Sequence, residues 1–109
     1  MDYDINKKKT GQPLVSFVIF FEDDDAGKLQ KCVDSVLRLS LRKEEREVIV
    51  IGDGTREPLV LLLNGMEDEV VVVRQPASGI NSAMNLGMRM ATGRYVQFLS
   101  AADTLLLDG

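Results

Sequence analysis

The sequence predicts an α/β domain: a Rossmann-like parallel sheet of about four strands with flanking helices, in three layers. Short apolar runs alternate with segments of helical periodicity throughout the chain after residue 12. The apolar runs are continuous, which is typical of strands buried on both faces of a sheet. Strands that alternate with helices at this pitch pair in parallel through right-handed crossovers.

The first strand is expected at Leu14–Phe21, a β-branched and aromatic run that follows a polar, flexible segment at 1–12. Apolar residues at three- and four-residue spacing then predict a helix. Its predicted buried residues are Leu29, Cys32, Val33, Val36 and Leu37. The acids Asp23–Asp25 are expected at or before its first turn, where carboxylates accept hydrogen bonds from free backbone amides.

The second strand is expected at Glu47–Ile51 and is followed by the turn sequence GDGT. A short helix is expected at Leu59–Leu63, because Pro58 suits a first helical turn and Asn64-Gly65 suits a helix end. The next run, Val70–Val73, is fully β-branched and predicts the third strand.

Ser78 is the expected N-cap of a last helix that continues to about Ala91, and Arg94–Leu99 is the expected fourth strand. The helix is expected to turn one apolar side to the sheet, formed by Ile80, Ala83, Met84, Gly87 and Met90. The domain organisation that follows is a flexible segment at 1–12 and a single domain at 13–109.

Composition excludes several classes of function. The chain has 109 residues, 45% hydrophobic and 28% charged, as in an ordinary soluble domain. A net charge of −4 offers no basic face for nucleic acid. One cysteine excludes an internal disulfide, and the absence of histidine excludes a histidine metal site or base. No apolar run suits a transmembrane segment and no signal-peptide pattern is seen, so a cytoplasmic location is expected.

The carboxyl ends of parallel strands meet at one edge of a sheet, where ligands bind in open α/β folds. Four loops should converge there: Phe20–Asp25, Gly52–Arg56, Arg74–Gly79 and Ser100–Asp103. They carry acids, glycines and helix amino ends, which suit a nucleotide because carboxylates accept from base N–H groups and glycines admit close backbone approach.

Five stretches in these positions carry a family resemblance. They are PLVSFVIFF with its acidic continuation, DSVL, EVIVIGDGT, RQPASGINSAMNLGMRMATGRY and VQFLSAAD. In this order the chain resembles the nucleotide-binding half of a family 2 glycosyltransferase, an inverting enzyme with the GT-A, nucleotide-diphospho-sugar transferase fold. The resemblance implies weak binding of a UDP-sugar or another nucleotide-sugar. The implied nucleotide-binding residues are Phe21, Glu22, Asp53, Thr55, Gly79 and Asn85.

Two of these residues also have purely structural interpretations. Asp53 stands where the family aspartate contacts the nucleotide base, yet a turn aspartate that bonds its own loop is the alternative. Asn85 matches the helix motif and could equally hold a loop in place.

The chain departs from the family pattern where the diphosphate and its cation would bind. Gly52 replaces an aspartate, and Met84 replaces an arginine that lies near the diphosphate in the family. Ser100 and Ala102 replace the aspartates of the DXD metal motif, leaving only the trailing Asp103. Magnesium and manganese need several hard oxygen ligands, so no metal is expected unless this degenerate site keeps some function. The acids of Glu22–Asp25 are a rival site, although helix-start electrostatics explains them more simply.

The sequence therefore predicts a glycosyltransferase-like domain that does not catalyse transfer alone. The family's general base lies on a second half, after the metal motif, so no catalytic residue is identified here. One alternative is an active enzyme completed by a missing segment or a partner chain. Another is a non-catalytic interaction module, because Arg94–Leu99 should form a sheet edge and Leu105–Leu107 would need cover. Both features favour a homodimer or hetero-complex through the last strand and the C-terminus.

Overall fold

The computed structural model of the chain describes residues 12–22, 26–54 and 69–101. Within these ranges it contains a four-stranded sheet in the order β4-β3-β2-β5, in which every pair of neighbours is parallel. The strands are β2 (Val15–Phe21), β3 (Arg46–Asp53), β4 (Val70–Gln75) and β5 (Tyr95–Ser100). The predicted parallel α/β fold is confirmed, and each strand lies within two residues of its predicted bounds.

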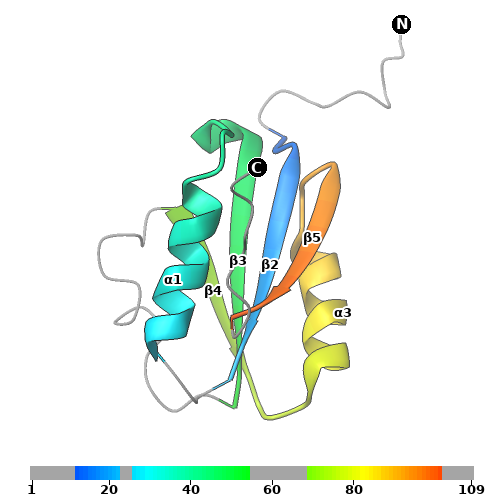
Figure 1. The fold of residues 1–109 in the computed structure, drawn as a ribbon. Coiled ribbons are helices and arrows are strands. Elements are labelled where there is room, and N and C mark those ends of the chain that lie inside the picture. Colours follow the sequence, from blue (N-terminus) through cyan, green and yellow to red (C-terminus); the bar gives the residue numbers. More distant parts are fainter. Residues whose placement is uncertain (1–11, 23–25, 55–68, 102–109) are drawn as a thin grey trace, which may run out of the picture.

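The helices α1 (Ala26–Leu37) and α3 (Ile80–Met90) lie on opposite faces of the sheet (Figure 1). Among the described residues, the larger cluster of buried side chains lies between α1 and the sheet. It includes the predicted stripe of Leu29, Cys32, Val33 and Val36, each with no exposed surface. The smaller buried cluster, on the α3 face, comprises Val18, Ile49, Ile51 and Ala83. The three-layer prediction is therefore confirmed.

Helix α3 packs very closely against β2 at Gly87. A Cβ atom added to Gly87 would overlap Val18 Cγ1 and lie 3.1 Å from Val18 Cγ2. Only a residue without a side chain permits this approach, and the glycine therefore fixes the distance of the helix from the sheet.

The predicted cap of this helix is wrong. Gly79, with φ +92° and ψ 168°, precedes Ile80 as the N-cap and makes no side-chain cap bond. The Ser78 hydroxyl donates instead to the Pro76 carbonyl oxygen at 2.7 Å. A serine that satisfies its own turn in this way is not available to cap the helix.

Further predictions lie outside the described residues: the flexible segment over residues 1–11, the acids at 23–25, the helix at 59–63 and the need for cover over the leucines at 105–107. No helix in the described ranges is both long and apolar enough to cross a membrane.

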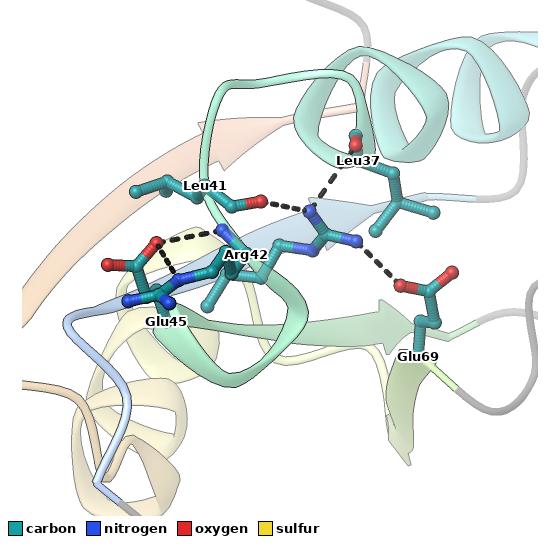
Figure 2. Close-up of polar contacts among 6 residues, drawn as sticks. Leu37, Leu41, Arg42, Glu45 and Glu69 are labelled. Atoms are coloured by element: carbon teal, nitrogen blue, oxygen red, sulfur yellow. Dashed lines mark hydrogen bonds and ion pairs between the residues drawn. The ribbon is translucent and has the colours of Figure 1, made fainter.

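Arg46 joins three elements at the amino end of the sheet, through its contacts to Leu37, Leu41 and Glu69, which Figure 2 shows. Arg46 Nη2 lies 2.6 Å from Glu69 Oε1, and its Nη1 donates to the carbonyl oxygens of Leu41 and Leu37 at 2.8 and 3.4 Å. The Arg46 side chain is only 11% exposed. It therefore links the C-terminal end of α1 to the starts of β3 and β4. The short 3₁₀ helix Lys43–Glu45 precedes it, closed by the bond from the Arg42 amide to Glu45 Oε1 at 2.8 Å.

A second polar network ties β2, β3 and the entry to β5 at the same end. Glu47 Oε1 accepts from the hydroxyl of Ser16 at 2.6 Å and from the amide of Thr92 at 2.9 Å. The buried Ser16 hydroxyl in turn accepts from the Gly93 amide at 2.8 Å. Because the buried Ser16 hydroxyl both donates and accepts here, the network satisfies a polar group that would otherwise destabilise the sheet.

Candidate functional site

The predicted convergence of loops at the carboxyl edge of the sheet is present for the described strands. In register, Phe20 of β2 lies beside Ser100 of β5, and Phe21 lies beside Gly52 of β3. On the other side, Asp53 of β3 pairs with Gln75 of β4. The last residues of all four strands therefore meet at one edge, next to the amino end of α3 (Figure 1).

The carboxylate of Asp53 is the most fully bonded group at this edge. Its Oδ1 accepts from Gln75 Nε2 and from the Ser78 amide, both at 2.8 Å, and its Oδ2 accepts from the Gly79 amide at 3.1 Å. Asp53 is only 7% exposed. It therefore binds the end of β3 to the loop that leads into α3, through the amides of Ser78 and of the N-cap residue Gly79.

The glycine that follows Asp53 makes this close approach possible. Gly54 has φ +66°, and its amide donates to the Gln75 carbonyl oxygen at 2.8 Å. A Cβ atom on Gly54 would lie 2.9 Å from the Ala77 Cβ. The turn after β3 thus needs glycine both for its backbone conformation and for space.

The hydrogen bonds to Asp53 make stability depend on pH. The bond from the Ser78 amide lowers the pKa of Asp53 below its ordinary value of 3.8, helped by Gln75 and Gly79 and opposed by burial. Because the folded pKa is lowered, the stabilisation is present above the unfolded pKa and is lost as pH falls through the folded one. We expect the difference in free energy of unfolding between the parent and Asp53→Asn to shrink between about pH 5 and pH 2.

Urea unfolding at a series of pH values measures this difference. Asp34→Asn is the matched control, because Asp34 is half exposed and its ion pair among the described residues is with Arg38, four residues further along the chain. A difference between the parent and Asp53→Asn that stays constant from neutral to acid pH would contradict the assignment.

The other predicted nucleotide-binding residues are more scattered. Phe21 is 2% exposed and belongs to the core on the α1 face, so only its backbone faces the edge. Glu22 follows it and is exposed, and Gly79 is exposed at the start of α3. Asn85 is exposed in the middle of α3, away from the strand ends. Thr55 lies outside the described residues.

The end of β5 carries Ser100, the first residue of the metal motif that the sequence predicts to be degenerate. Ser100, the last residue of β5, is partly buried and lines a pocket of about 190 Å³ together with Met84 of α3. Ser100 and Met84, two of the residues at which the chain differs from the family pattern, therefore line the same pocket. Ala102 and Asp103 lie outside the described residues.

The described residues at this edge do not fit a divalent cation. The pocket beside Ser100 is walled by apolar side chains, whereas Mg²⁺ and Mn²⁺ take hard oxygen ligands. In the described part of the chain, no three acidic or thiol side chains gather as a metal-binding group.

A larger hollow of about 380 Å³ lies at the opposite, amino edge of the sheet. Its lining includes Arg46, Glu47 and Glu69, whose charges already serve the two networks described above. This hollow lies at the starts of β3 and β4, at the other end of the sheet from the candidate site.

Two residues at the carboxyl edge escape prediction from the sequence. Gln75 and Ser78 were not expected to hold Asp53, although both are its hydrogen-bond donors. One contact could have been found from the parallel pairing of the second and third predicted strands. That pairing places Gln75, which follows the VVVVR run, beside Asp53 at the end of the second strand.

Comparison with known families identifies one that matches most of the chain. The model of the family described as "Glycosyl transferase family 2" matches residues 16–107. The chain is 29% identical over 94 residues to the uncharacterized glycosyltransferase EpsJ of Bacillus subtilis, covering 84% of this chain and 26% of EpsJ. It is 31% identical over 86 residues to the chondroitin synthase of Pasteurella multocida, covering 76% of this chain and 9% of the synthase. The chain thus spans about a quarter or less of each of these two relatives.

Solved structures share the fold. The mannosyltransferase PcManGT of Pyrobaculum calidifontis, in complex with GDP-Man and Mn²⁺, aligns with a TM-score of 0.65 at 18% identity, over 84% of this chain and 28% of that one. S. aureus TarS 1-349 aligns with a TM-score of 0.67 at 17% identity, over 81% of this chain and 28% of that one.

Proposed function

The chain belongs to glycosyl transferase family 2, and we propose that it is a nucleotide-sugar-binding domain that does not catalyse glycosyl transfer by itself. The observation that carries the proposal is the Asp53 carboxylate, held at the carboxyl edge between the end of β3 and the start of α3. The fold of the chain is shared with PcManGT, a mannosyltransferase whose structure is a complex with GDP-Man.

Asp53 can both hold the loop before α3 and accept a hydrogen bond from a nucleotide base. Its Oδ1 accepts two hydrogen bonds within the protein, whereas its Oδ2 accepts one from Gly79. A carboxylate oxygen can accept about two hydrogen bonds, so Oδ2 has capacity for an N–H group of a base. We assign Asp53 to the base, with Glu22, Thr55 and the Gly79 backbone beside the nucleotide and Phe21 contributing only its main chain. Asn85 would act from a distance by holding α3.

Calorimetry tests this assignment. We expect the parent to bind UDP or GDP, or one of their sugars, weakly and without added metal. Asp53→Asn replaces one acceptor oxygen by a donor, and we expect an affinity about tenfold lower, the effect of losing one charge-assisted hydrogen bond. Asp34→Asn, which changes an acid on α1, should bind as the parent does. Equal affinities for the Asp53 and Asp34 variants would contradict the role of Asp53 at the base.

The lack of independent catalysis is supported by the residues at the end of β5. A hydroxyl and a thioether, Ser100 and Met84, stand where the family pattern has a carboxylate and a guanidinium. Neither can neutralise a departing diphosphate. An active enzyme completed by a further segment is the alternative, and it would need a cation held by other residues.

The outer edge of β5, which pairs with no other described strand, supports association with another chain. Of the four described strands, β5 is at one end of the sheet, as predicted, and its pairing groups on the far side face no described strand. Its sequence, YVQFLS, contains no charge to discourage pairing, and Tyr95 is 57% exposed. We propose that this strand pairs with a second copy or a partner. Light scattering after size exclusion should give a dimer mass, and a monodisperse monomer would contradict the homodimer.

A further inference from the structure

The pocket that contains Ser100 is apolar at nearly every position. It is formed by β2, β3, β5 and the first half of α3 and has a volume of about 190 Å³. Of the nine described residues that line it, all but Ser100 are apolar: Val18, Phe20, Ile51, Ile80, Ala83, Met84, Phe98 and Leu99. Its innermost residues are Val18, Ile51 and Ala83, each at most 2% exposed. None of the described lining residues carries a charge.

We propose that this pocket binds an uncharged apolar ring of about the size of benzene. An apolar cavity of about 150 Å³ in a protein binds benzene, so the volume here is sufficient for one such ring. A sugar or a phosphate would suit it poorly, because among the described lining residues Ser100 alone supplies a polar side chain, whereas such ligands need several hydrogen-bond partners.

The pocket is held open by the contact at Gly87. Gly87 follows Ala83 by one helical turn, on the same side of α3, and is already in tight contact with Val18. The helix therefore cannot move closer to the sheet to fill the space beside Ala83. The small Ala83 side chain leaves the volume that a larger residue would occupy.

Ordered water is a poor occupant of this space. A buried water typically makes about three hydrogen bonds, and the described lining residues offer few partners for them. Replacing weakly held water by an apolar ring is favourable, since the ring buries apolar surface without unpairing polar groups.

Methyl NMR during a benzene titration tests the proposal. Benzene should shift the methyl resonances of Val18, Ile51 and Met84 through its ring current, and leave that of Met88 unchanged. Met84→Arg places a guanidinium in the pocket and should weaken benzene binding at least tenfold. Met88→Arg makes the same substitution one turn later on α3, at a side chain that is 55% exposed, and should leave binding unchanged.

Ile80→Asp is a second variant for the case in which Met84→Arg does not fold. Ile80 is 48% exposed at the first residue of α3, where a carboxylate favours the helix, yet it lines the pocket. It should also weaken benzene binding. The proposal is overturned if the pocket methyls of the parent do not respond to benzene, or if the folded pocket variant and Met88→Arg bind it equally. No nucleotide is present in this titration, so its outcome does not depend on the proposed function.

Discussion

Replacing Gly93 with alanine is expected to destabilise the protein by about 3 kcal/mol, at the upper end of the cost of overpacking a core. The added Cβ would lie 2.6 Å from the Ser16 hydroxyl oxygen, 2.7 Å from the Ser16 amide nitrogen and 2.9 Å from the Val15 carbonyl carbon. Two of these atoms belong to the backbone of β2, which cannot rotate away as a side chain can. Relief would move the loop and break the bond from the Gly93 amide to Ser16.

Chemical denaturation of the two proteins measures this effect. Gln97→Ala is a suitable control, because Gln97 is exposed on the adjoining strand β5 and surface substitutions usually change stability by less than about 0.5 kcal/mol. If Gly93→Ala were as stable as Gln97→Ala, the close approach of the loop to β2 would be wrong.

Arg46→Ala is expected to cost about 2–3 kcal/mol. Breaking a fully buried ion pair costs about 3–5 kcal/mol, and the value here is lower because Glu69 is 30% exposed. The substitution leaves the Glu69 carboxylate and the carbonyl oxygens of Leu37 and Leu41 without this donor (Figure 2). The junction between α1, β3 and β4 should therefore loosen first, and amide hydrogen exchange should speed up there.

Arg38→Ala provides the matched control for this arginine. Arg38 also forms a short ion pair, 2.8 Å from Asp34, but its side chain is 79% exposed. An exposed pair of this kind contributes less than about 1 kcal/mol. Comparable losses of stability in the two variants would show that burial of Arg46 does not matter.

The strands could be predicted from the sequence because burial on both faces selects continuous apolar runs. The bounds could not be predicted as well, since polar residues extend the pairing. Arg46 extends the start of β3, where it pairs with Val15, and Asp53 extends its end, where it pairs with Gln75. These charged residues are accommodated in the strand because Glu69 and Gln75 bind their side chains. Such partners leave no local pattern in the chain.

The site was predictable only in outline. Parallel strands alone place Asp53 and Ser100 at one edge, and the structure has both there. At the start of α3 the Ser78 amide, and not its hydroxyl, bonds to Asp53. This contact could not be predicted from the sequence around Ser78, because Asp53 belongs to β3. The apolar pocket depends on the close contact at Gly87, and helical periodicity alone had placed Ile80 on the buried side, whereas it is 48% exposed.

The central claim is that replacement of carboxylates at positions 100 and 102 has removed metal-dependent binding of a nucleotide-sugar. Calorimetry of UDP-sugars and GDP-sugars with and without Mn²⁺, on the parent and on the double variant Ser100→Asp/Ala102→Asp, tests it most directly. We expect Mn²⁺ to leave the affinity of the parent unchanged and to raise that of the double variant about tenfold or more, as restored oxygen ligands hold the cation. Tight, Mn²⁺-dependent binding by the parent would contradict the claim.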